Sequence, residues 1–276
     1  MVKFLKNCVY LLSILFFLKV FSDIEFKYLL LSFTEHIGVT LISILLIFFS
    51  QLTLGIVWSR FLNKKYNLNF MHSLKIFIIS VPAKYIPGKV TSPILRVDSI
   101  KFKNIKSELL FFIFTENIIV LIQNILFGLY FFFDSLNIFE YLLILNFVFF
   151  IIFNFHKTKY KKFSFEYLKN IFLIEFSTFF NILGIYLILT LFKIENPFQI
   201  SLLYIFTIGL SMIIFLVPAG VGVRENIFIE YGQQQNMNLA MTSSISILLR
   251  SVFVIADLIF LILNFYFKVF TKASRS

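Results

Sequence analysis

The chain has few of the residues on which soluble enzymes and disulfide-stabilised domains depend. Its one cysteine, Cys8, excludes an intrachain disulfide and a cysteine-ligated metal cluster. None of its three histidines, His36, His72 and His156, has an acidic residue placed to form an acyltransferase-type or metal-type motif. The motifs HExxH and GxSxG are also absent from the sequence. We therefore expect no cofactor, no metal and no enzymatic activity.

Charged residues are scarce as well, at 14% of 276 residues, whereas 59% are hydrophobic and the mean hydropathy is +0.92. Soluble domains are about 45–50% apolar, so the composition predicts an integral membrane protein. The apolar residues form long runs and do not alternate with polar ones, which favours helices over a β-barrel. We assign the abundant phenylalanine to lipid-facing positions and infer no aromatic cofactor site from it.

The few charges are unbalanced, with a formal net charge of +11. The lysines cluster beside apolar runs, which is the positive-inside pattern and also attracts anionic lipid. This placement favours a membrane over nucleic acid as the partner. We expect a multi-pass protein of the inner (cytoplasmic) membrane, with both termini in the cytoplasm.

The apolar runs predict an all-α polytopic protein with about six full spans in a single domain, residues 1–276. The N-terminal run resembles a signal peptide, because Lys3 and Lys6 precede it and Val20 and Ser22 form a passable cleavage pattern. We interpret it as a retained first span. The other predicted spans are residues 37–62, 107–133, 141–155, 167–192 and 239–267.

Two further apolar segments are predicted to be re-entrant hairpins. Residues 71–87 are too few to cross comfortably, since a spanning helix needs about 20 residues, and Pro82 and Pro87-Gly88 interrupt them. Lysines on both sides keep both ends of this segment cytoplasmic. Residues 200–232 must enter and leave from outside if the last span ends in the cytoplasm, as the basic residues after it indicate.

The order span, hairpin, span then occurs twice in opposite orientations, over about 37–133 and about 167–267. This is an inverted-repeat arrangement, in which broken helices place a binding site near the membrane midplane. The alternative is seven or eight full spans, because residues 200–217 are long enough to cross.

The most unusual segment is residues 216–231, LVPAGVGVRENIFIEY, where irregular backbone and two charges interrupt an apolar run. Such backbone is tolerated at membrane depth only where protein or water satisfies its polar groups. Pro218 ends a helix, Gly220 and Gly222 allow a tight turn, and a helix that restarts near Arg224 directs its positive end at the turn. That end suits an anion, with Glu225 expected to hold the Arg224 guanidinium when no ligand is bound. The alternative is an ordinary turn with an arginine that reaches the membrane surface.

The last predicted span has one polar stripe, because Ser243, Arg250, Asp257 and Asn264 are seven residues apart. A charge at the centre of a membrane helix costs about 2.5–3.5 kcal/mol on insertion scales, so Arg250 and Asp257 should have partners. They lie about 10 Å apart along the helix, too far to pair with each other. The available partners are Glu116, Glu175 and Glu225 for Arg250, and Arg224 for Asp257. A purely structural ion-pair network is the alternative to a functional one.

Several motifs resemble those of the lysylphosphatidylglycerol synthase transmembrane-region family, which is also described as flippase-like. They are PAKYIPGK at residues 82–89, then Arg96, Glu116, VPAGVGVRE at residues 217–225, and Leu249-Arg250. The resemblance covers roughly residues 40 to 265. Members with a fused cytoplasmic aminoacyltransferase domain make and flip aminoacylated phosphatidylglycerol. No such domain is found in this sequence, so the resemblance implies the membrane module only. Stand-alone relatives are often associated with envelope glycan or glycolipid assembly.

Together, the residues and the resemblance predict a protein that binds an anionic lipid or lipid-linked sugar and moves it between leaflets. Basic residues near the first hairpin would gather the phosphate, the Arg224 turn would hold it at mid-depth, and Arg250, Glu116 and Glu225 would exchange partners as it passes. The alternative is a non-transporting subunit that scaffolds a glycosyltransferase or lipid synthase of the envelope. The expected substrate-binding residues are Lys84, Tyr85, Pro87, Gly88, Lys89, Arg96, Glu116, Pro218, Gly220, Gly222, Arg224, Glu225, Arg250 and Asp257.

The topology can be tested at the C-terminus. Because lysines place both termini in the cytoplasm, a cysteine introduced by Ser276→Cys in a Cys8→Ser background should react with a membrane-impermeant thiol reagent only after the cells are permeabilised. Labelling of intact cells would contradict the inverted-repeat arrangement.

Overall fold

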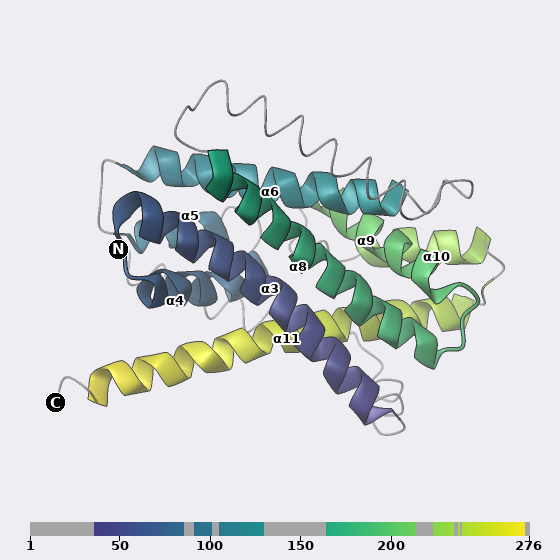
Figure 1. Ribbon diagram of the computed structural model, residues 1–276. Coiled ribbons are helices and arrows are strands. Elements are labelled where there is room, and N and C mark those ends of the chain that lie inside the picture. The colour runs from purple at the N-terminus through teal and green to yellow at the C-terminus, as the bar shows by residue number, and fades with distance from the viewer. Residues whose placement is uncertain are drawn as a thin grey trace.

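The structure is a computed structural model that describes residues 36–85, 91–100, 105–129, 164–213, 223–234, 237 and 239–273. Most of these residues lie in helices, and there is no strand among them (Figure 1). Four helices are long and apolar enough to cross a membrane. They are α3 (Ile37–Tyr66), α6 (Lys106–Leu129), α8 (Ser164–Leu191) and α11 (Leu239–Ala273). The fold agrees with the predicted helical membrane protein. The predicted first span and the span 141–155 lie outside the described residues, so the count of six stays a prediction.

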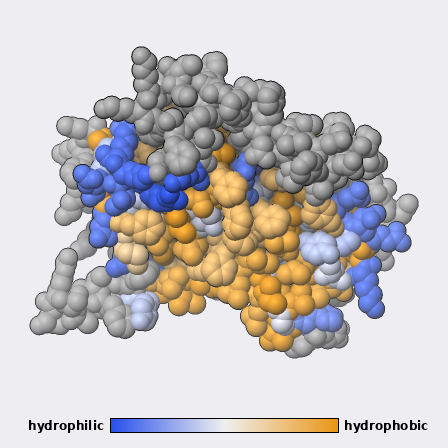
Figure 2. Space-filling model, in the orientation of Figure 1, coloured by the Kyte–Doolittle hydropathy of each residue, from blue (hydrophilic) through white to orange (hydrophobic). Residues whose placement is uncertain are grey.

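The outer surface of these helices is apolar. Among the most exposed large side chains are Phe114 of α6, Phe172 of α8 and Ile262 of α11. On the face in Figure 2, apolar residues cover the middle of the described surface and hydrophilic residues gather towards its two ends. A large exposed apolar face of this kind would be an aggregation hazard in water, and it is suited to contact with lipid tails.

Shorter helices lie between the long ones, at both predicted hairpins. The first half has α4 (Phe70–Ser80), the 3₁₀ helix η1 (Val81–Tyr85) and α5 (Thr91–Asp98). The second half has α9 (Pro197–Ile213) and α10 (Val223–Gln234). The hairpin residues Pro87, Gly88, Lys89, Pro218, Gly220 and Gly222 lie outside the described residues.

Local sequence explains where these short helices begin and end. Asn69 caps α4 by accepting hydrogen bonds from the backbone N–H groups of Met71 and His72. The α-helical part ends at Ser80, before Pro82, and continues as the tighter 3₁₀ turn, which confirms the predicted interruption. Pro197 stands at the first position of α9, where its missing N–H is tolerated. The predicted restart near Arg224 is confirmed, because α10 begins at Val223.

The last helix, α11, joins two apolar cores. One core lies around α8, α9 and α10 and includes Tyr204, Phe228 and Leu249, of which α11 supplies Leu249. The other lies around α3, α4 and α6 and includes Trp58 and, from α11, Phe260. Helices that are far apart in the sequence also pack together, because α8 lies beside α3 and the shorter helix α9 lies beside α6 (Figure 1).

The contact between α6 and α9 depends on Gly128. A Cβ atom at this position would lie 2.1 Å from Phe206 Cβ and 2.7 Å from Phe206 Cα, so a backbone would have to move. We expect Gly128→Ala to lower the free energy of unfolding by about 1–3 kcal/mol through overpacking. Thermal unfolding in detergent measures this.

The matched control is Gly38→Ala in α3, where a Cβ atom would have nothing within 4 Å. It should leave the unfolding midpoint unchanged or raise it slightly, since alanine favours a helix over glycine. Equal midpoints for the two variants would show that α6 and α9 do not pack as described.

Candidate functional site

A carboxylate on α11, that of Asp257, holds the 3₁₀ helix η1 and α3 against α11. Its side chain is fully buried, and Lys84 Nζ lies 2.8 Å from each of its two oxygens. The Tyr85 hydroxyl and the Gln51 amide of α3 also donate to it. Sequence reasoning offered Arg224 as the partner of Asp257, and this was wrong. The 3₁₀ turn after α4 brings Lys84 and Tyr85 against α11 instead.

Arg96 of α5 is held by contacts of several kinds. Its Nε donates to Ser80 Oγ at 3.0 Å. Its guanidinium carbon lies 4.2 Å from the centre of the Phe77 ring and 5.8 Å from the centre of the Trp58 ring, which places the cation over two aromatic faces. Its Nη1 forms an ion pair with Glu116 of α6 at 3.3 Å.

Arg250 of α11 pairs with Glu225 of α10. Glu225 was one of three acids expected to be available to it, and this part of the prediction is confirmed. The pair is incomplete, because Arg250 Nε and Glu225 Oε2 are both buried without a hydrogen-bond partner among the described residues. Leaving a buried polar atom unpaired costs about 1–3 kcal/mol, so the two atoms favour a further polar group at this place.

Arg224 stands one residue before Glu225 but does not pair with it, which corrects the expectation that Glu225 holds its guanidinium. Its Nε donates to Ser211 Oγ of α9 at 3.0 Å. Among the described residues no acidic side chain forms an ion pair with Arg224. The group formed by Arg224, Arg250 and Glu225 therefore contains two cations and one anion.

The two halves hold their arginines in the same way. Ser80 lies at the end of α4 and Ser211 near the end of α9, and each donates to the backbone carbonyl three residues earlier at 2.7 Å. Each also accepts from the Nε of an arginine on the short helix that follows, Arg96 or Arg224, at 3.0 Å. Sequence reasoning missed both serines, since a serine in an apolar helix commonly bonds only to its own backbone.

The two halves differ in the charged residue that the long helix after the arginine, α6 or α11, places near that arginine. In the first half this residue is Glu116 of α6, which pairs with Arg96. In the second half it is Arg250 of α11, which lies close enough to Arg224 to repel its charge. The arginine of the first half is therefore neutralised, whereas that of the second half has a second cation nearby.

The group formed by Arg224, Arg250 and Glu225, called here the Arg224 group, lies near Asp257 and its hydrogen-bond donors. Tyr85, which donates to Asp257, lies within electrostatic reach of both Arg224 and Arg250. Residues of η1, α10 and the middle of α11 thus lie near one another, and whether they bind a substrate stays a prediction. Arg96 and Glu116 form a separate group between α5 and α6.

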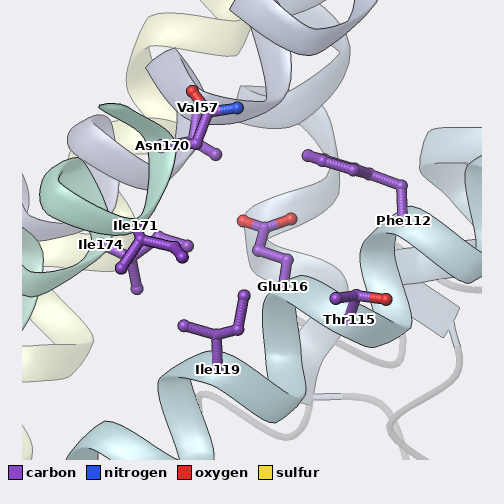
Figure 3. A pocket seen from close by; sticks show the side chains of 8 residues that line it. All are labelled: Val57, Phe112, Thr115, Glu116, Ile119, Asn170, Ile171 and Ile174. Atoms are coloured by element: carbon purple, nitrogen blue, oxygen red, sulfur yellow. The ribbon is translucent and has the colours of Figure 1, made fainter. Parts of the chain in front are cut away.

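A small pocket adjoins Glu116 between α3, α6 and α8, and Figure 3 shows the carboxylate pointing into it. The lining is mostly apolar, and Asn170 of α8 contributes a carboxamide oxygen that is buried without a hydrogen-bond partner among the described residues. Glu116 and Gln123 are seven residues apart on one face of α6, and both are buried. The pocket residues are Val57, Phe112, Thr115, Glu116, Ile119, Asn170, Ile171 and Ile174.

The part of the chain that the structure describes contains no group of three or more His, Cys, Asp or Glu side chains that could hold a metal ion. Comparisons of the chain with protein-family models, with curated proteins and with solved structures find no match. The resemblance to the lysylphosphatidylglycerol synthase transmembrane-region family therefore stays a prediction that rests on its motifs.

The buried position of Asp257 predicts a large stability effect. Asp257→Asn leaves the Lys84 charge without a counter-ion, and we expect a loss of about 2 kcal/mol in the free energy of unfolding. The loss should be smaller than for a fully buried pair, because the Lys84 side chain is 37% exposed. Removing both charges with Lys84→Met and Asp257→Asn should restore part of the loss, which a double-mutant cycle in detergent measures.

The matched control is Asp98→Asn, which breaks the exposed ion pair between Asp98 and Lys106. Exposed pairs contribute about 0–1 kcal/mol, so this variant should unfold close to the wild-type midpoint. If Asp257→Asn were no more destabilising than Asp98→Asn, Asp257 would not hold η1 and α3 against α11.

Proposed function

We propose that this protein binds the phosphate group of an anionic lipid or lipid-linked sugar between its two hairpins and moves that lipid between leaflets of the inner membrane, in envelope lipid or glycan assembly. The observation that carries the proposal is the state of the Arg224 side chain. This guanidinium is fixed in place through Nε, yet no acidic side chain among the described residues pairs with it.

A phosphate matches what the Arg224 group lacks. Two arginines and one glutamate leave one positive charge, which a bound anion neutralises. Ser211 accepts a hydrogen bond from the Nε of Arg224. A guanidinium can also bind a phosphate through two parallel hydrogen bonds. Arg250 adds a second cation and an unpartnered Nε beside it. The start of α10 adds the positive end of a helix dipole.

The first half supports this use of the arginine. Arg96, with the same serine contact, binds an oxyanion through Nη1, in this case the carboxylate of Glu116. A guanidinium that is oriented by a serine through Nε is thus able to bind a carboxylate with its terminal nitrogens. We infer that Arg224 binds a ligand oxyanion in the same manner.

We further infer that the two halves are inverted repeats. The order α3, α4, α5, α6 is matched by α8, α9, α10, α11, and the serine–arginine contact recurs at the corresponding place in each. Inverted repeats with broken helices place a binding site at the midplane and allow one half to rock against the other. That motion would expose the Arg224 group first to one leaflet and then to the other.

Arg224→Lys tests the proposal, because it keeps the charge and removes the two-point hydrogen bonding. We expect normal membrane abundance and a fall in lipid transport of roughly tenfold or more, since a hydrogen bond to a charged group contributes about 1.5–3 kcal/mol. The assay is translocation of fluorescently labelled phosphatidylglycerol in proteoliposomes, measured by chemical quenching of the outer leaflet.

The matched control is Arg60→Lys near the end of α3, which should transport as the wild type does. Wild-type transport by Arg224→Lys at equal reconstitution would refute the role of Arg224. If the wild-type protein moved no anionic lipid under conditions where it is folded, the scaffolding role would be the better explanation.

A further inference from the structure

We propose that Arg96 is a second anion site, closed in this structure by Glu116, and that a phosphate-bearing headgroup opens it by exchange with Glu116 as that carboxylate takes up a proton. This inference rests on the proposed function, because the anion is the same headgroup that Arg224 binds. It adds a chemical link between anion binding and proton uptake.

Arg96 does not need Glu116 to stay in place. Ser80 holds its Nε, and the rings of Phe77 and Trp58 cover its guanidinium. These three partners belong to α4 and α3, whereas Glu116 belongs to α6. The cation therefore remains positioned for an oxyanion after the glutamate has left.

Of the contacts that Arg96 makes, the one with Glu116 is best suited to replacement by a phosphate. It joins one nitrogen to one oxygen at 3.3 Å, which is longer than the roughly 2.7–2.9 Å of a strong charge-assisted hydrogen bond. A phosphate that binds through two parallel hydrogen bonds has the better geometry for a guanidinium. The ligand would replace a one-point contact with a two-point contact.

Among the described residues, no cation other than Arg96 forms an ion pair with Glu116. The pocket that it faces is formed mainly by Val57, Phe112, Ile119 and isoleucines of α8 (Figure 3). An ionised carboxylate is strongly disfavoured in such surroundings and takes up a proton instead. The protonated acid can then donate to the unpartnered oxygen of Asn170 across the pocket.

Charged groups on the neighbouring elements do not change this outcome. The other acids of α6 and α5 are already paired, Glu108 with Lys65 and Asp98 with Lys106. On α9, which also packs on α6, the buried titratable residue is Tyr204, which contacts rings of α10 and α11.

The remaining neighbour is α8, which faces the pocket with Asn170, Ile171 and Ile174. The charged residues of α8 whose side chains the structure describes, Lys169 and Glu175, are not among the residues that line the pocket. Among the described residues, Arg96 is thus the charged group that acts on Glu116.

The exchange is balanced in charge. An anion and a proton enter, the pair of Arg96 and ionised Glu116 separates, and the products are Arg96 paired with the anion and neutral Glu116. Because one proton is taken up for each anion bound, binding at this site tightens as the pH falls, by up to about tenfold per pH unit. In the Arg224 group the acid, Glu225, is paired with Arg250 and not with Arg224. An anion can therefore bind Arg224 without displacing a carboxylate, and we expect no proton uptake to accompany binding there.

Proton uptake during lipid binding tests the inference. The full-length protein in detergent is mixed with short-chain phosphatidylglycerol in weakly buffered solution near neutral pH, and a pH-indicator dye reports the protons taken up. We expect uptake by the wild type, and an affinity that weakens as the pH rises. In Glu116→Gln we expect lipid binding without uptake at Arg96 and without that pH dependence.

The matched control is Glu175→Gln, which removes a carboxyl of α8 that lies outside the pocket and should leave proton uptake at the wild-type level. A parallel titration with dimethyl phosphate, a phosphodiester that carries one negative charge throughout the neutral range, separates a lipid headgroup from a free phosphate anion. Uptake with the lipid alone supports a site for the lipid headgroup, and equal uptake with dimethyl phosphate would overturn that assignment in favour of a free anion.

Lipid binding by the wild type without proton uptake would overturn this inference and leave the proposed function standing. Uptake that is unchanged in Glu116→Gln would overturn it as well. Failure of the wild type to bind any anionic lipid would overturn both. The wild-type measurement needs no variant, so it decides the matter even if Glu116→Gln does not fold.

Discussion

The cost of placing charge inside a membrane is the constraint on which the structure depends, and Asp257 shows how the chain meets it. This carboxylate lies on the last span and accepts hydrogen bonds from α3 and from the 3₁₀ turn after α4. Because an unpaired carboxylate is so unfavourable there, Lys84 and Tyr85 must stay against α11. The helices α3 and η1, near the start of the described chain, are thereby joined to α11 at its end.

Arg96 and Arg224 differ in how their positive charge is compensated. Arg96 has a carboxylate from the adjoining long helix, whereas Arg224 has the charge of Arg250 within electrostatic reach, together with that of Glu225, which pairs with Arg250. An ion pair that is complete within the protein gives a ligand little to gain. A cation group that is incomplete gains free energy when an anion arrives, so the difference between Glu116 and Arg250 assigns different tasks to two otherwise similar contacts.

The apolar runs were sufficient to predict α3, α6, α8 and α11, and Pro82 predicted where α4 stops, because these features depend on local residue chemistry. Partners across helices were harder to predict. The polar stripe on α11 showed that Arg250 and Asp257 needed partners, but it identified Glu225 only as one of three and Arg224 wrongly. Pairing depends on how the helices are rotated about their axes and how far each is shifted along them, and neither is encoded in the spacing on a single helix.

The serines explain why an arginine can be rigid here without an acid. At each hairpin the serine hydroxyl donates to a carbonyl near the end of its own helix and accepts the Nε–H of the arginine. One neutral group thus satisfies a helix end and orients a cation, and it contributes no negative charge. A carboxylate in its place would orient the arginine equally well but would neutralise it. Because the orienting group is neutral, the positive charge of Arg224 remains available to an anion that can arrive and leave.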